Sequence, residues 1–412
     1  MRFPRALCRL VFGLTFIFSG LVKLLSPVGT SLIINEYLSA LHLGFLSGIA
    51  LPAGLLLAAC EFTVGLCVLL SVRIKVFSGI GFYMTCFFTV LTLCLALFNP
   101  ISDCGCFGEA VHLTNWQTFF KNLILLPCIA LLYFQRKKID PIAHPAVEWC
   151  FAGFFILTAV ALWLHSYLYV PMYEFTPYKI GSYVSTEDDG ADFVTTFIYS
   201  KDGEQKSFTL ENLPDSTWTY VESVTEMTGE TGQYSDFILL DGEGNDIAQN
   251  ILASDDAVLV SIYDPAKLKS RHWKRIEDFA QKALAAGAEL YVASAVNGDA
   301  IPDSFPYEVG YGDRKLLLTI NRANGGATLF SDSYISQKWT QATMDGAVLE
   351  ELLSDDGETL VLRNAIHSNV RTSCLVLGLL LMLILIYYIC KISYKDSSLN
   401  KWRRRQKNEK EK

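Results

Sequence analysis

The sequence has no cysteine between Cys150 and Cys374, although it has eleven cysteines in all. The long stretch between those two residues therefore contains neither a structural disulfide nor a redox-active thiol. Charged residues are also scarce: they make up 18% of the chain, against 51% hydrophobic residues. Typical soluble domains contain about 25% charged residues, so the composition excludes an ordinary soluble protein.

Apolar residues are concentrated in two parts of the chain, residues 1–170 and 372–391. A membrane-spanning helix needs about 20 mainly apolar residues, because the hydrocarbon core is about 30 Å thick and a helix rises about 1.5 Å per residue. We therefore expect six spanning helices, in residues 8–25, 51–71, 76–98, 116–134, 148–170 and 372–391. The more polar stretch 31–50 is predicted to lie at the membrane interface or against the bundle.

Lysine and arginine form four groups, located before the first predicted span, between the second and third, between the fourth and fifth, and after the sixth. Their members are Arg2, Arg5 and Arg9; Arg73 and Lys75; Arg136, Lys137 and Lys138; and Lys391, Lys395, Lys401, Arg403, Arg404 and Arg405. Six spans place all four groups on one face, which the positive-inside rule makes cytoplasmic. We predict a bacterial inner-membrane protein with cytoplasmic termini, in contact with lipid, whose loops 26–50, 99–115 and 171–371 are periplasmic.

The predicted periplasmic region is acidic. Residues 171–370 hold 33 of the 42 acidic residues and 14 of the 34 basic ones, a net charge of -19. Such a surface repels phosphate backbones, so no nucleic-acid partner is expected. A periplasmic protein, as client or redox partner, fits this region better.

The pattern divides the chain into five segments. Residues 1–138 are predicted to form a four-helix membrane bundle, 139–171 a fifth spanning helix, and 371–412 the sixth span with a basic tail. Residues 172–250 alternate polar and apolar residues between turn signals, which predicts a small β-rich segment with strands at 192–200, 206–210 and 218–224. Residues 251–370 are predicted to form an α/β domain.

The order of elements expected in that domain is similar to the thioredoxin order. The elements are a strand at Ala257–Tyr263, a helix at Lys267–Ala286, strands at Glu289–Ala295, Leu316–Ile320 and Ala327–Phe330, a strand ending at Trp339, and a helix at Leu349–Leu353. Thioredoxin places Cys-x-x-Cys after its first central strand, whereas this chain has Asp264-Pro265-Ala266-Lys267 there. We therefore expect a thioredoxin-like domain without catalytic cysteines, which serves as a docking platform.

Only Cys104 and Cys106 are expected in an oxidising, water-accessible loop. Gly105 between them permits the unusual backbone angles that a bond between such close cysteines needs. Three hypotheses stay open: thiol–disulfide exchange, a structural clip, or a metal site with His112. The metal hypothesis lacks a fourth ligand, so no metal is predicted.

Three further residues are candidates for a functional role. Cys94 lies about ten residues before Cys104 and is a possible resolving thiol. Glu61 lies near the middle of the second predicted span, where a carboxylate costs several kcal/mol unless it is partnered. Lys23, near the outer end of the first span, is its expected partner. Glu61 is predicted either to fix helix packing or to belong to a proton or ligand pathway.

The membrane region resembles the DoxX/MauE family, and most closely its MauE branch. The resemblance covers about residues 1–135 and rests on Phe16–Lys23 in the first span, Glu61 with Gly65 in the second, and Asp103–Gly108 ahead of Asn115 and Trp116. It implies a four-helix membrane protein associated with periplasmic redox chemistry, in which Cys104 and Cys106 take the redox role.

The sequence therefore favours a membrane component of thiol–disulfide maturation of periplasmic proteins, a possible enzyme. A non-enzymatic scaffold with a structural loop disulfide, and a small-molecule or proton pathway centred on Glu61, are the alternatives. No cofactor is evident. A quinone is a conceivable electron acceptor, but the sequence contains no quinone motif.

Overall fold

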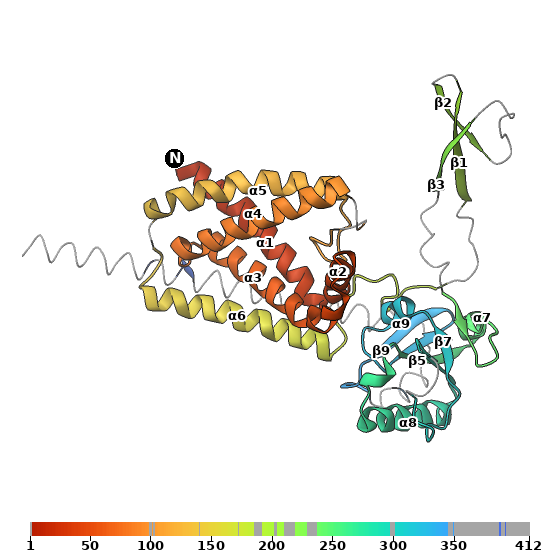
Figure 1. The fold of residues 1–412 in the computed structure, drawn as a ribbon. Helices are drawn as coiled ribbons and strands as arrows, with labels where there is room; N and C mark the ends of the chain where they lie inside the picture. The colour runs from red at the N-terminus through yellow and green to blue at the C-terminus, as the bar shows by residue number, and fades with distance from the viewer. Residues whose placement is uncertain are drawn as a thin grey trace, which may run out of the picture. The chain divides into compact units, whose positions relative to one another are not determined.

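The computed structural model describes residues 2–98, 101, 104–139, 141–171, 173–184, 192–201, 204–209, 219–228, 237–296, 301–344 and 349, together with 387, 388 and 392. Its described residues fall into two compact units, a helical unit within Met1–Thr176 and Arg363–Lys412, and a second unit within Pro177–Leu362. Figure 1 shows the long helices of the first unit and the main sheet of the second.

The helical unit contains six α-helices and two short 3-10 helices among its described residues. They are α1 (Arg2–Leu25), α2 (Pro27–Ala40), η1 (Gly44–Ile49), α3 (Ala50–Leu70), α4 (Ile74–Phe98), α5 (Asn115–Gln135), η2 (Arg136–Lys138) and α6 (Pro145–Leu168). Five segments are long and apolar enough to cross a membrane, namely Phe3–Leu25, Gly44–Leu70, Ile74–Phe98, Asn115–Lys138 and Pro145–Leu168. These segments coincide with the first five predicted spans.

The sixth predicted span, residues 372–391, lies outside the described residues except for Tyr387 and Tyr388. Tyr387 packs against the apolar core of the helical unit. The stretch 31–50, predicted to lie at the interface or on the bundle, forms most of α2 and all of η1, and α2 packs on α3.

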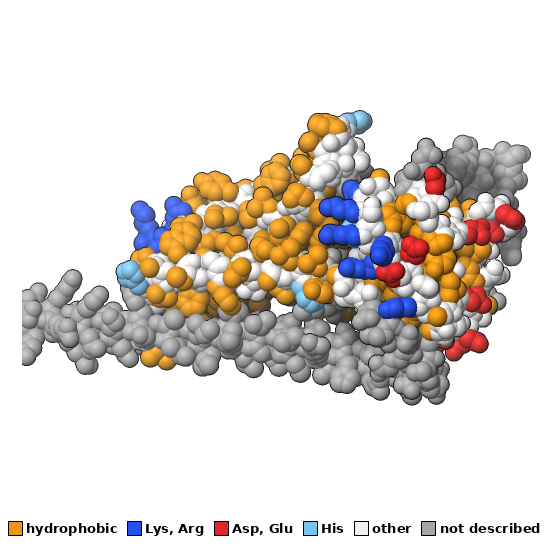
Figure 2. Space-filling model, turned by 90° about the horizontal axis from the view of Figure 1, so that it is seen from below, with side chains coloured by type: hydrophobic (Ala, Val, Ile, Leu, Met, Phe, Trp, Pro, Cys, Tyr) orange, Lys and Arg blue, Asp and Glu red, His pale blue; other side chains and the backbone are white. Residues whose placement is uncertain are grey.

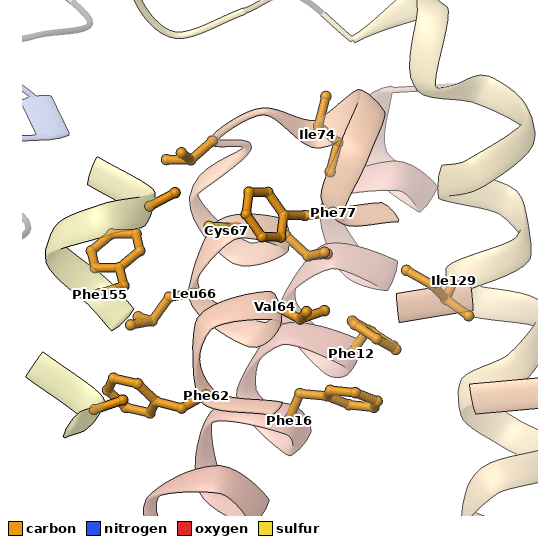
Figure 3. Packing of buried hydrophobic residues seen from close by; sticks show 14 of the residues in the cluster. Phe12, Phe16, Phe62, Val64, Leu66, Cys67, Ile74, Phe77, Ile129 and Phe155 are labelled. Atoms are coloured by element: carbon orange, nitrogen blue, oxygen red, sulfur yellow. The ribbon is translucent and has the colours of Figure 1, made fainter. Parts of the chain in front are cut away.

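Helix α3 lies at the centre of the helical unit. Figure 3 shows Val64, Leu66 and Cys67 of α3 between Phe155 of α6 and Phe12 of α1. Many side chains on the outside of the bundle are large and apolar, and on the face drawn in Figure 2 they cover most of the helical unit. A surface of this kind is stable in lipid and unstable in water.

Two glycines let α1 and α3 approach to backbone contact. A Cβ atom at Gly20 would lie 2.5 Å from the amide nitrogen of Phe62, and one at Gly65 would lie 2.7 Å from the amide nitrogen of Ile17. Small residues allow such close crossings between membrane helices. The crossing places the C-terminal half of α1 directly against the middle of α3.

The second unit contains a six-stranded mixed sheet in the order β4-β7-β6-β5-β8-β9. Its elements are β4 (Leu239–Leu240), α7 (Ala248–Ala253), β5 (Asp256–Ile262), η4 (Pro265–Lys267), α8 (Ser270–Ala285), β6 (Glu289–Ser294), β7 (Gly310–Gly312), α9 (Arg314–Ile320), β8 (Gly326–Ser331) and β9 (Tyr334–Trp339). Strands β5 and β6 are parallel, and β8 pairs antiparallel with both β5 and β9.

The sheet is covered on both faces by apolar clusters. Trp273, Ile276 and Phe279 of the amphipathic helix α8 pack on one face, and Leu317 and Ile320 of α9 pack on the other. The same strands contribute residues to both clusters, because successive side chains of a β-strand point to opposite faces of the sheet.

The predicted strand at Leu316–Ile320 is wrong: this segment belongs to helix α9. The carboxylate of Asp313 accepts hydrogen bonds from the amides of Lys315 (2.7 Å) and Leu316 (3.2 Å). Asp313 is therefore the N-cap residue of α9, and this cap favours a helix over a strand. A short apolar run does not by itself distinguish a buried strand from one buried helical turn. Of the predicted helix Leu349–Leu353, only Leu349 lies within the described residues.

A separate three-stranded antiparallel sheet has the order β2-β1-β3. Its strands are β1 (Asp192–Lys201), β2 (Glu204–Thr209) and β3 (Thr219–Thr228). They occur where the alternating pattern predicted strands at 192–200, 206–210 and 218–224.

Candidate functional site

The loop between α4 and α5 carries the Cys104-Gly105-Cys106 sequence and is held at both ends. The side-chain amide of Asn115 donates to the carbonyl of Ile101 (2.8 Å), and the hydroxyl of Ser26 donates to the carboxylate of Glu109 (2.7 Å). These contacts fix the loop against the start of α5 and the junction of α1 and α2.

Two glycines give the loop its tight turn. Gly105 and Gly108 have φ angles of +63° and +55°, and the amide of Gly108 donates to the carbonyl of Gly105 (2.9 Å). A Cβ atom at Gly105 would lie 2.6 Å from the side chain of Ile33. Glycine therefore supplies both the backbone angle and the space that the turn requires.

This turn brings the two thiols together. The sulfur atoms of Cys104 and Cys106 lie 3.2 Å apart. Cys104 is buried, and the hydroxyl of Tyr37 in α2 donates to its carbonyl (2.8 Å) and lies 3.4 Å from its sulfur. Cys106 is only partly buried. The pair can therefore exchange between a dithiol and a disulfide with only small sulfur movements.

A buried ion pair between Lys23 and Glu61 contacts the backbone of Cys106. The Nζ atom of Lys23 lies 2.7 Å from the carboxylate of Glu61, and both side chains are about 5% exposed. The same ammonium donates to the hydroxyl of Ser19 (2.8 Å) and to the carbonyl of Cys106 (2.7 Å). An ammonium group has three donors, and all three of these are used.

The hydroxyl of Ser19 adds to this network. It lies 2.8 Å from the Glu61 carboxylate and 2.6 Å from the Cys106 carbonyl. A hydroxyl has one proton, so Ser19 donates to one of these two acceptors at a time. The network thus joins the carboxylate in the middle of α3 to the cysteine loop through two side chains of α1.

The electrostatics favour a thiolate on Cys106. The hydrogen bond from the Cys104 thiol, together with the positive charges of Lys121 and Lys23, lowers the pKa of Cys106 to about 6. The pKa of Cys104 is raised, because its proton is held between the two sulfurs and the residue is buried. Lys121 also lies over the ring of Phe107, with its Nζ atom 4.4 Å from the ring centre.

This difference gives a testable pH dependence. Reduced protein treated with iodoacetamide should be alkylated at Cys106 at nearly its full rate at pH 7, since only the thiolate reacts. A Cys104→Ala variant should need a higher pH for the same rate, because the largest stabilising hydrogen bond is lost. Peptide mass spectrometry of Cys106 across a pH series measures both midpoints. Equal midpoints in the two proteins would contradict this assignment.

The structure brings together four of the five residues singled out in the sequence: Cys104, Cys106, Glu61 and Lys23. The fifth, Cys94, is exposed on α4, and none of its described contacts involves the cysteine pair. His112 is an exposed loop residue, and the described residues contain no group of three or more His, Cys, Asp or Glu side chains that could hold a metal.

Three residues of the site were missed by sequence reasoning: Ser19, Tyr37 and Lys121. Ser19 had a usable signal, because it lies four residues before Lys23 and thus on the same face of α1. Tyr37 and Lys121 had none, since tyrosine and lysine near the ends of membrane helices commonly anchor them at the interface.

In the second unit, the segment after β5 contains an ion pair in place of thiols. Lys267 lies 2.7 Å from the carboxylate of Asp264. The side chain of Asn324 accepts from the amide of Asp264 (3.0 Å) and donates to its carbonyl (2.6 Å). These contacts stabilise the end of β5 without any group capable of redox chemistry.

The five apolar segments define a multi-pass membrane protein. Within it, residues 1–135 match the family described as "Methylamine utilisation protein MauE", so the helical unit up to the end of α5 is MauE-like. Residues 193–230, which contain β2, β3 and all of β1 except Asp192, match a domain of unknown function, DUF8463. No curated protein and no solved structure matches the chain.

Proposed function

We propose that this protein exchanges disulfides with a partner protein through Cys104 and Cys106. The contact between their sulfur atoms, 3.2 Å apart in a loop fixed from both sides, is the observation that carries this proposal. In one direction the pair gives two electrons and two protons to a disulfide of the partner, and Cys104 and Cys106 become a disulfide. The reverse reaction oxidises a partner dithiol and restores both thiols.

The expected compartment agrees with this chemistry. Under the positive-inside rule the basic residues that follow α3 and α5 face the cytoplasm, which makes the loop between α4 and α5 periplasmic. Disulfides form and persist in the bacterial periplasm. The MauE-like character of residues 1–135 also favours a redox-associated role.

The second unit is proposed to hold the partner. Its parallel β5-α8-β6 unit, followed by the antiparallel pair β8-β9, supports the thioredoxin-like assignment. Because this unit contains no cysteine, its contribution is binding and not electron transfer. Glu61 belongs to the same proposal, since it is linked to the Cys106 carbonyl through Lys23 and Ser19.

The proposal predicts that a Cys104→Ser/Cys106→Ser variant loses disulfide exchange without losing the fold. The test is acid quenching of intact cells, alkylation with a mass tag, and measurement of the redox state of both residues in the wild type. The wild-type pair should shift between dithiol and disulfide when cells are treated with reductant and allowed to recover. The double variant should reach wild-type abundance and accumulate reduced or misoxidised partner proteins.

The matched control is Cys94→Ser, which removes an exposed cysteine that has no described contact with the pair. It should behave like the wild type. A wild-type pair that stays fully oxidised under every condition, together with unstable double-variant protein, would instead identify a structural clip in a membrane scaffold.

A further inference from the structure

The two cysteines of the pair are covered to different degrees. Cys104 is 6% exposed, with the hydroxyl of Tyr37 on its sulfur and carbonyl. Ile33, one turn earlier in α2, lies beside Gly105. Helix α2 therefore shields the Cys104 side of the turn. Cys106 keeps part of its surface exposed, so of the two residues it is the more accessible to a partner.

The two cysteines also differ in how the site stabilises a negative charge. A thiolate on Cys106 accepts a hydrogen bond from Cys104 and is favoured by the ammonium groups of Lys121 and Lys23. The backbone of Cys106 is held in place by the donors of Lys23 and Ser19. Accessibility and charge stabilisation thus select the same sulfur, and a thiolate is the form that attacks a disulfide.

We infer that Cys106 is the sulfur that forms the mixed disulfide with the partner protein, and that Cys104 resolves it. This inference rests on the proposed function. The Cys106 thiolate attacks one sulfur of the partner's disulfide, whose S–S bond breaks, and the second partner sulfur leaves as a thiolate and takes a proton from water. Cys104 then loses its proton and attacks the sulfur of Cys106. The mixed disulfide breaks, and the partner's first sulfur leaves and is protonated.

The reverse reaction passes through the same intermediate. A partner thiolate attacks Cys106 in the Cys104–Cys106 disulfide, and Cys104 leaves as a thiolate. The hydroxyl of Tyr37, 3.4 Å from the Cys104 sulfur, is placed to donate to that leaving thiolate. Hydrogen bonds to a charged sulfur lower the energy of the charged form. Tyr37 is thereby assigned as a positioning residue for the resolving thiol.

The experiment compares Cys104→Ser and Cys106→Ser in the full-length protein in native membranes. After acid quenching and thiol blocking, non-reducing electrophoresis should show a reductant-sensitive adduct in Cys104→Ser, because its mixed disulfide has no internal thiol to resolve it. Cys106→Ser should show at least about tenfold less adduct, since its remaining thiol, Cys104, is buried beneath α2 and burial raises its pKa. The double variant should show none.

A measurement without the natural partner gives an independent readout. Purified single variants are reduced and treated with 5,5'-dithiobis(2-nitrobenzoic acid), and modification of each residue is followed by peptide mass spectrometry. Cys106 in the Cys104→Ser variant should react faster than Cys104 in the Cys106→Ser variant. An adduct confined to Cys106→Ser, or faster modification of Cys104, would overturn the role assignment and leave the exchange function standing. A wild-type pair that never changes redox state would overturn the function itself.

Discussion

Replacing Glu61 with leucine is expected to destabilise the helical unit by about 3–5 kcal/mol, the usual cost of leaving one member of a buried ion pair unpaired. The ammonium of Lys23 would keep only the Ser19 hydroxyl and the Cys106 carbonyl as partners, with no counter-charge. Thermal unfolding of the full-length protein in detergent, followed by tryptophan fluorescence, measures the loss.

A Lys23→Met/Glu61→Leu variant separates stability from function. It removes both charges, so its unfolding temperature should lie above that of Glu61→Leu, with the coupling given by a double-mutant cycle. It should still exchange disulfides poorly, because Lys23 also anchors the Cys106 carbonyl (2.7 Å). Additive losses of stability in the cycle would show that Lys23 and Glu61 are not coupled. A double variant with full disulfide exchange would show that Lys23 is not needed to hold the cysteine loop.

The partnership of Lys23 and Glu61 was predictable because an apolar bundle offers few alternatives. The first five predicted spans contain few ionisable side chains deep in the membrane, and a buried carboxylate requires a partner. The sequence did not show that the same ammonium would also bind the Cys106 carbonyl. That contact depends on the path of the loop, which is determined by Gly105, Gly108 and the Asn115–Ile101 hydrogen bond.

Long periodic elements were predicted more accurately than short ones. Five spans and helix α8 have enough apolar residues for length and periodicity to identify them. Helix α9 has seven residues, so its Leu316–Leu318 run fits a strand equally well, and the Asp313 cap decides between the two. Tyr37 was unpredictable for another reason: its role depends on how α2 folds back over the loop, which no local pattern encodes.

Introducing leucine at Gly20 is expected to give the second large effect, because it forces apart the two helices that form the site. Even a Cβ atom there would lie 2.5 Å from the Phe62 amide nitrogen and 2.8 Å from the Ala58 carbonyl, and these backbone atoms cannot move aside as a side chain can. Overpacking of this kind typically costs about 1–3 kcal/mol, and more where backbone must shift. The unfolding temperature of the full-length protein should fall.

The effect should extend to the chemistry, because Ser19 directly precedes Gly20 and Lys23 follows one turn later on α1. Separation of α1 from α3 lengthens the Lys23–Glu61 contact (2.7 Å) and releases the Cys106 carbonyl from its donors. The pH midpoint for alkylation of Cys106 should therefore rise as Lys23 withdraws.

Gly153→Leu is the matched control, since a Cβ atom at this helical glycine of α6 meets no atom within 4 Å. Equal losses in both variants would show that a leucine in any helix of the bundle is harmful, whereas a loss confined to Gly20→Leu identifies the α1–α3 crossing as the support of the cysteine site.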